Sequence, residues 1–342
     1  MTKLVPRIII LLLPLFVLQG CNDNRDKFTE TYISALSRGD LLEATVDTDK
    51  LTYSYKVLDG DYKGTALGEG RGTLKPYPDV SRNAYQTKIN DQVTTVVALQ
   101  GEVIIGHIGN EFYVGVPERK QPINVADIAG LYNYVSYSPN GTLDEGLGFK
   151  IPWEKTSFGI LRLNDDNTWA VLHKGDLKTS SKKPTLEGSF TDMGNGALLL
   201  ERNGGKFAHV MVRYDNSGDH FAVVDLVDPD FKGIAFANFQ SPVSSDNIQG
   251  PYTALLTHET KAPKCLAQDG YMSVNGDATK YSMKFNTPWP GFVRADAPAL
   301  GGNRYEVFGI ISRQSGSIYG IHLERQPHGA AANQQGFIAL KD

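Results

Sequence analysis

The sequence predicts a mainly β protein, and three observations lead to this fold class. The 342 residues include 35 glycines and 17 prolines, which place turns at short intervals along the chain. They also include 16 tyrosines and 15 phenylalanines, which favour strands. From residue 51 onward, short apolar or alternating runs are separated by turn residues, as in antiparallel sheets. We expect an N-terminal α+β segment followed by two related antiparallel β-barrel or β-sandwich units.

The N-terminal segment is predicted to begin with a helix over residues 25–38. Gly39 follows as a helix C-terminal cap would. The apolar residues that fall at helical spacing are Phe28, Tyr32, Ile33 and Leu36. Strands are expected at 51–57 and 94–99, and a hairpin at 103–116 turns at Gly109-Asn110. These elements predict a domain over residues 21–118, followed by a charged linker that ends at Pro122.

Residues 128–240 and 248–342 are predicted to be two diverged copies of one β-unit. Four short segments recur in order, at separations of 120, 111, 108 and 103 residues, as loop deletions in the second copy would produce. The pairs are 128–132 with 248–252, 159–169 with 270–281, Gly194-Asn195 with Gly302-Asn303, and 232–235 with 335–339. In the first copy, we expect residues 158–163 to pair with 168–172, and 207–214 with 221–226.

The first twenty residues are predicted to be an export signal. Lys3 and Arg7 precede an apolar run from Ile8 to Leu18. As a helix this run would be roughly 16 Å long, too short for a hydrocarbon core of about 30 Å. The polar residues 22–26 follow soon after it and end the apolar stretch. These features favour a cleaved signal over a membrane anchor helix.

The four residues Leu18-Gln19-Gly20-Cys21 resemble the lipobox of bacterial lipoproteins. The resemblance implies that the Cys21 thiol receives a diacylglycerol, that the chain is cut before Cys21, and that the new amine is acylated, with palmitate as the expected label. Two or more acyl chains hold a protein stably on a membrane. Asn22 stands where the inner-membrane retention signal of enteric bacteria has Asp. By that analogy we expect the outer membrane, with the periplasmic or surface face left open.

Charge excludes nucleic acid as a partner, and cysteine content excludes an intramolecular disulfide. Removal of residues 1–20 takes away Lys3 and Arg7 and no acidic residue, so the net charge falls from −4 to −6. Nucleic acid as a partner calls for a clustered basic face, and we exclude it. Cys265 is then the one cysteine not used by lipid, so an intramolecular disulfide cannot form. We interpret Cys265 as a buried or inert thiol, with a reactive nucleophile as the alternative.

No motif for a metal or cofactor is found, and we expect none to be bound. The seven histidines include no H-E-x-x-H and no zinc-type spacing. His209 and His220 lie on neighbouring predicted strands, where exposed positions are favoured over a metal or haem site. Asp225, Asp228 and Asp230 surround Pro229, and we interpret them as an acidic turn in preference to a calcium loop.

Aromatic residues are the remaining candidates for ligand or partner contact. Trp153 and Trp289 lie in loops that contain proline, and Tyr132 and Tyr252 begin the two units. The alternative is that these tryptophans plug a barrel end. We therefore expect a non-enzymatic envelope lipoprotein with an unidentified protein partner, acting as an assembly factor or as an inhibitor or immunity-type protein. The alternatives are a lipid- or small-ligand-binding barrel and a hydrolase whose residues assemble only in space.

Overall fold

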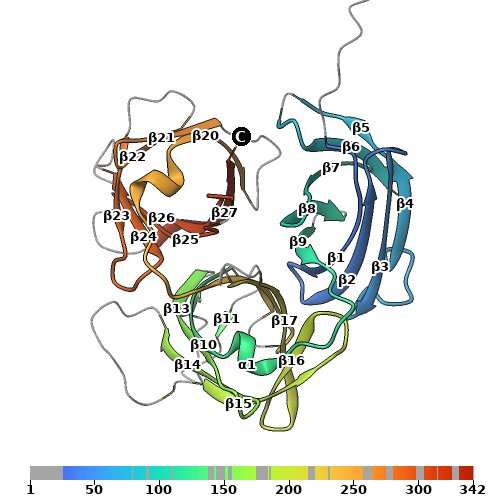
Figure 1. Cartoon of the computed structure of the whole chain (residues 1–342), viewed down its shortest axis with the longest axis horizontal. Helices are drawn as coiled ribbons and strands as arrows, with labels where there is room; N and C mark the ends of the chain where they lie inside the picture. The colour runs from blue at the N-terminus through green and yellow to red at the C-terminus, as the bar shows by residue number, and fades with distance from the viewer. Residues whose placement is uncertain are drawn as a thin grey trace, which may run out of the picture.

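The prediction of a mainly β protein is confirmed. A computed structural model describes residues 26–341, with the exception of 79, 90–91, 109–110, 138–141, 144–150, 153–155, 175–183, 185, 215–219, 230–231, 257–263, 275–279, 298–303, 314 and 326–330. Three β-sheet units surround a common centre (Figure 1). In the described part of the chain, the helices are two single turns, α1 (Val125–Ile128) and the 3₁₀ turn η1 (Ser245–Ile248).

The first unit is a nine-stranded antiparallel sheet of order β4-β3-β2-β1-β9-β8-β7-β6-β5. It curls on itself until β4 lies against β6, where a Cβ added to Gly72 would be 2.5 Å from Thr87 Oγ1. The predicted hairpin at 103–116 is confirmed by the pairing of β8 with β9. The strands are β1 (Thr29–Leu36), β2 (Asp40–Asp47), β3 (Thr52–Asp59), β4 (Glu69–Thr73), β5 (Lys75–Pro76), β6 (Ala84–Ile89), β7 (Gln92–Leu99), β8 (Val103–Ile108) and β9 (Glu111–Pro117).

The helix predicted over residues 25–38 is wrong, because this segment contains β1. Tyr32 and Leu36 point into the interior of the first unit, whereas Ile33 and Ala35 point out of it into a core shared with the other units. Apolar residues therefore occupy both faces of one strand and reproduce helical spacing by coincidence. Gly39 is a turn residue between β1 and β2, with φ of +90°, and does not cap a helix.

The second and third units are closed eight-stranded barrels whose neighbouring strands follow one another along the chain. A two-stranded sheet of β11 (Thr142–Leu143) and β12 (Ile151–Pro152) interrupts the first barrel. That barrel contains β10 (Gly130–Tyr137), β13 (Thr156–Leu163), β14 (Thr168–Lys174), β15 (Leu186–Asp192), β16 (Ala197–Arg202), β17 (Gly205–Tyr214), β18 (His220–Leu226) and β19 (Gly233–Phe239). The other contains β20 (Gly250–Leu256), β21 (Lys264–Gln268), β22 (Tyr271–Val274), β23 (Lys280–Phe285), β24 (Phe292–Ala297), β25 (Arg304–Ile311), β26 (Ile318–Arg325) and β27 (Ala331–Lys341).

The two barrels open in the same way. Each begins with one helical turn and a glycine of positive φ, Gly130 at +150° and Gly250 at +128°. The tyrosine two residues later donates its hydroxyl to the last carbonyl of that turn. The oxygen–oxygen distances are 2.7 Å for Tyr132 and 2.8 Å for Tyr252. The recurrence of 128–132 as 248–252 therefore falls on equivalent positions.

Two of the other segment pairs do not fall on equivalent strands. Residues 159–169 run through the first barrel's second and third strands, whereas 270–281 run through the other barrel's third and fourth strands. Gly194-Asn195 joins β15 to β16, the fourth and fifth strands. Gly302-Asn303 lies outside the described residues, between the fifth and sixth strands of its barrel. The common descent of the two units stays a prediction.

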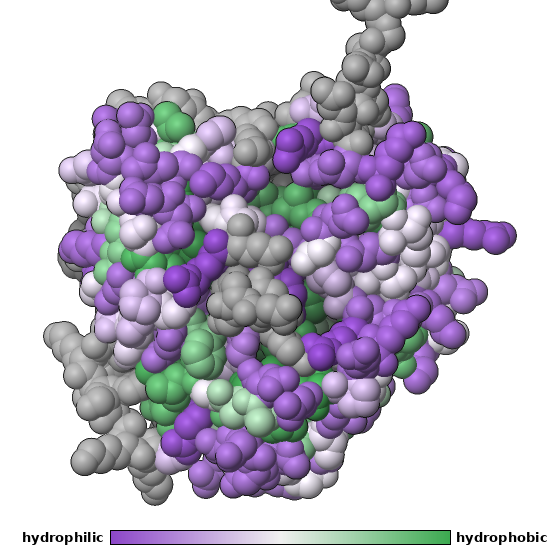
Figure 2. Space-filling model, in the orientation of Figure 1, coloured by the Kyte–Doolittle hydropathy of each residue, from purple (hydrophilic) through white to green (hydrophobic). Residues whose placement is uncertain are grey.

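The core has four parts: one interior for each unit and a shared core between them. Strand β18 shows how one strand serves two of these parts. Ala222 and Val224 point into the barrel, while Phe221 and Val223 point into the shared core. Polar residues cover most of the face seen in Figure 2, and apolar residues gather toward the middle of the units. The centre of the molecule is thus a buried junction of three sheets.

Candidate functional site at the junction of the three units

Strand β17 brings three side chains to this junction. His209, Met211 and Arg213 alternate with the interior residues of the barrel and therefore share its outer face. Met211 is part of the shared core. His209 and Arg213 lie on either side of it along the strand, and each belongs to a polar group described below.

His209 forms a buried pair with Asp225 on the neighbouring strand. The two residues are register partners across β17 and β18, and His209 Nδ1 lies 2.9 Å from Asp225 Oδ2. The exposed fractions of the two residues are 1% and 0%, so both are withdrawn from water. The other ring nitrogen, Nε2, lies 3.5 Å from Asp59 Oδ2, at the end of β3 in the first unit. The imidazole is therefore hydrogen-bonded to Asp225, while Nε2 lies close to the carboxylate of another unit without a hydrogen bond.

Two lysines of the first barrel complete the contact with the first unit. Lys206 Nζ lies 2.5 Å from Asp59 Oδ2, and Lys232 Nζ lies 2.8 Å from Asp61 Oδ2. Asp40 is fully buried nearby and accepts a hydrogen bond from the Tyr62 backbone N–H at 2.8 Å. This side of the junction is therefore held by charge pairs as well as by apolar contact.

Burial and neighbouring charges shift the pKa values of these carboxyl groups in different directions. Burial raises the pKa of Asp225 to about 6; the bond to His209 opposes this rise, while Asp40 and Asp59 add to it. Burial also raises the pKa of Asp40. Burial acts to raise the pKa of Asp59 as well, but the hydrogen bond and charge of Lys206 outweigh it and leave that pKa below its ordinary value.

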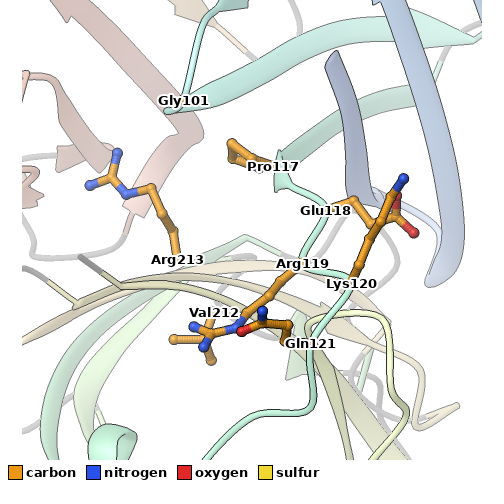
Figure 3. A pocket seen from close by; sticks show the side chains of 8 residues that line it. All are labelled: Gly101, Pro117, Glu118, Arg119, Lys120, Gln121, Val212 and Arg213. Carbon is orange, nitrogen blue, oxygen red and sulfur yellow. The ribbon is translucent and has the colours of Figure 1, made fainter. Parts of the chain in front are cut away.

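On the other side of Met211, an open cleft of about 480 Å³ separates the first unit from the first barrel. Figure 3 shows the connection after β9 along one side of the cleft and Arg213 rising from β17 on the other. Arg119 extends from the connection toward Val212 (Figure 3). The lining residues are Gly101, Pro117, Glu118, Arg119, Lys120, Gln121, Val212 and Arg213.

The connection that lines the cleft is fixed at both ends. The Glu118 backbone N–H donates to the Thr31 carbonyl at 2.8 Å, and the Ile123 N–H donates to Asp192 Oδ2 at 2.8 Å. Between these points, Gly196 of the first barrel packs against Arg119. A Cβ added to Gly196 would lie 2.8 Å from Arg119 Cβ. The cleft is therefore preformed from residues of both units, with little ordering needed on binding.

Arg213 is held in place by both barrels. Its guanidinium carbon lies 5.6 Å from the centre of the Phe221 ring, and its Nη2 donates to Ser312 Oγ of the second barrel at 3.2 Å. Its exposed fraction is 8%, and Ser312 is fully buried. All three units therefore position the cleft, so its geometry depends on the assembled chain.

The sequence-predicted contact residues are not brought together here. Tyr132 and Tyr252 are buried inside their barrels, so the expectation that they contact a partner is corrected. Trp289 is partly buried and packs edge-on against Phe292 beside the shared core. Trp153 and Cys21 lie outside the described residues. Cys265 is a buried cysteine of the second barrel that takes part in no disulfide, in line with its interpretation as a buried thiol.

The interpretation of the histidines and acids also needs correction. His209 is buried, not exposed, and it faces Asp225, whereas His220 stacks on Tyr132. Asp225 belongs to β18 and not to a turn. Asp230 lies outside the described residues. Among the residues that the structure describes, no group of three His, Cys, Asp or Glu side chains is arranged to hold a metal ion.

Sequence reasoning missed the cleft. Residues 117–122 were interpreted only as a linker, and no signal ties Arg119 to Arg213, which lies 94 positions further along. The one feature of the sequence that points to this segment as a binding surface is that charged residues stand between Pro117 and Pro122, because prolines stiffen a connection.

No helix in the described part of the chain is long and apolar enough to cross a membrane.

Three solved structures align with most of this chain at low identity. A DUF3598-family protein of unknown function from Nostoc punctiforme is 7% identical, over 94% of this chain and 97% of its own, with a TM-score of 0.19. Intact Ap-TbpB, with its N and C lobes, is 9% identical over 92% and 76%, with a TM-score of 0.20. A double mutant of transferrin binding protein B from Haemophilus parasuis is 8% identical over 93% and 76%, with a TM-score of 0.18. TM-scores this low support no conclusion about this chain. No protein-family model and no curated protein matches the sequence.

Proposed function

We propose that this chain is a lipid-anchored, non-enzymatic binding protein of the bacterial envelope, and that it acts on a protein partner. The observation that carries the proposal is the open, charged cleft at the junction, which all three units position. A preformed surface cleft with charged walls suits recognition of another molecule. Anchoring through Cys21 would keep this cleft in the envelope, where such a partner is met.

The packing of the first barrel's interior weighs against a lipid- or small-ligand site inside that barrel. The interior of the first barrel contains Trp169, Phe190 and Phe207 among many aliphatic side chains. The Trp169 indole N–H donates to the Ser189 and Glu201 carbonyls at 3.0 and 3.2 Å, and its ring stacks on Phe207. Apolar residues fill the described interior in the way that side chains fill small barrels.

The buried His209–Asp225 pair weighs against a hydrolase. A catalytic histidine orients one ring nitrogen with a carboxylate and offers the other to a nucleophile or water. Here the second nitrogen, Nε2, faces the Asp59 carboxylate, and the ring is 1% exposed. The pair joins two units and is closed to a substrate. We therefore assign it a structural role within the proposed binding protein.

The anchor is tested by labelling cells with radioactive palmitate. The Cys21→Ala variant should take up no label and accumulate as an uncleaved precursor, because the acylated thiol is gone. Cys265→Ala is the matched control, since Cys265 is the other cysteine and is buried in the second barrel. The control should be labelled like the wild type. Equal labelling of Cys21→Ala and the wild type would refute the lipoprotein assignment.

A further inference from the structure

The cleft is positively charged in a chain that is negative overall. Arg119, Lys120 and Arg213 line it together with one acidic residue, Glu118. The whole chain carries a net charge of −4, so this concentration of positive charge is local. A recessed site with low-dielectric walls focuses such a field and attracts an anionic group.

The chemistry of the lining narrows the anion further. Arginine forms two parallel hydrogen bonds to a carboxylate or phosphate, and two arginines take part here. Glu118 lies at the same cleft and repels a doubly charged phosphate more than a singly charged carboxylate. Pro117 adds apolar surface to the wall. The lining thus fits a carboxylate that stands next to an apolar group.

We propose that the cleft binds an acidic peptide segment of the protein partner, with a carboxylate paired to Arg119 and a neighbouring apolar side chain against Pro117. This inference rests on the proposed function, since it names the chemistry by which the partner is recognised. Lys120 is exposed at the rim, where it attracts the segment without making its main contact. The contact with Gly196 positions the backbone and Cβ of Arg119, and the Ser312 bond positions Arg213, whose charge adds to the field of the cleft.

The proposal is tested with the processed, lipidated protein in non-ionic detergent and two fluorescent hexapeptides. One peptide alternates Glu with Leu, and the other alternates Gln with Leu. Because a hydrogen bond to an ionised acceptor is stronger than one to a neutral acceptor, the Glu peptide should bind at least about tenfold more tightly. Its affinity should fall as salt rises, since the cleft is open. Equal affinity for the two peptides would overturn the proposal.

Three variants locate the binding. Arg119→Gln should weaken binding of the Glu peptide about tenfold, because it removes one charged donor. Arg119 carries the test, since Arg213 is buried against the second barrel and its replacement can disturb folding. Lys120→Gln should have a smaller effect and reduce the salt dependence. Lys280→Gln is the matched control, an exposed lysine on the second barrel outside the cleft lining. An unchanged affinity for Arg119→Gln, or an equal loss for Lys280→Gln, would overturn the proposal.

Two further measurements are needed. The first distinguishes a phosphate from a carboxylate as the bound anion, and the second distinguishes failure of the cleft proposal from failure of the proposed function. Displacement of the peptide by inorganic phosphate at lower concentration than by acetate would assign the cleft to phosphate and overturn the peptide proposal.

In intact cells, a photo-reactive phenylalanine analogue is placed at Gln121, in the cleft, and at Tyr271, exposed on the second barrel. A protein cross-linked at Gln121 and lost in Arg119→Gln supports the cleft. Cross-links from Tyr271 alone would overturn the cleft and leave the proposed function standing.

Discussion

Replacement of Asp225 by Asn should change how stability depends on pH, because the Asp225 carboxyl is fully buried beside His209. Asn keeps the size of the side chain and an oxygen that can accept a hydrogen bond from His209. It cannot ionise. The variant therefore mimics the protonated carboxyl at every pH, and a comparison with the wild type isolates the free energy of ionising this one group inside the protein.

The expected magnitude follows from the pKa of Asp225, which burial raises from 3.8 to about 6. The folded protein therefore holds this proton more tightly than the unfolded chain does. The stability associated with the raised pKa is complete below about pH 4 and is lost as the pH rises to about 6. A shift of about two units corresponds to roughly 3 kcal/mol. The free energy of unfolding of Asp225→Asn, relative to the wild type, should thus increase by about that amount between pH 4 and pH 7.

The measurement is urea unfolding followed by circular dichroism, at several pH values between about 4 and 7 and at constant ionic strength. Asp165→Asn is the control, because it removes the same charge from an exposed position in the turn after β13. The raised pKa of Asp40 also lowers wild-type stability over this range, but the comparison with the variant largely cancels it. A flat difference for Asp225→Asn, or one that decreases as pH rises, would refute the assigned burial of charge.

Two further predictions concern the interior of the barrels. Tyr252→Phe and Tyr132→Phe should each lower the free energy of unfolding by roughly 1–3 kcal/mol, because each buried hydroxyl donates to the last carbonyl of a helical turn, which loses its donor. Thermal unfolding of both variants checks this, and unchanged stability of either variant would contradict it. Gly188→Ala should destabilise by several kcal/mol, since its Cβ would lie within van der Waals overlap of the Glu201 carbonyl and the Trp169 indole; Gly204→Ala, whose Cβ meets open space, should cost only about 1 kcal/mol, and equal effects would argue against the packed interior.

Two hairpins of the first barrel could be predicted from sequence, because a short polar turn joins two apolar runs in each of them. Residues 158–163 and 168–172 were expected to pair, and β13 pairs with β14. The expectation that 207–214 pairs with 221–226 is likewise confirmed by β17 and β18. The register of that hairpin also predicts the buried His209–Asp225 pair. Because Tyr214 faces His220, counting back along both strands places His209 opposite Asp225. His209 and His220 are therefore not partners across this hairpin.

The cleft and the shared core could not be predicted, because they depend on how three units meet. Arg119 and Arg213 come from a connection and a strand that no local pattern links. The same limit explains the error at β1. Its residues are buried on both faces, by the interior of its own unit and by the shared core. Amphipathic periodicity assumes one buried face, so it fails where a strand has two.

Strands that lack amphipathic periodicity show where the junction of the three units lies. Strand β3 alternates between exposed and buried residues, and β15 and β23 alternate mainly between exposed and half-buried ones, so each has one face toward solvent. Strands β8, β9, β18 and β19 are buried almost throughout, and members of each contribute to the shared core. In an antiparallel sheet an uninterrupted apolar run means that a second layer covers the outer face. The continuous apolar runs thus mark the side that a unit turns toward the centre. The cleft opens beside β9, one of these strands, so the edge of the shared core is also where the candidate site forms.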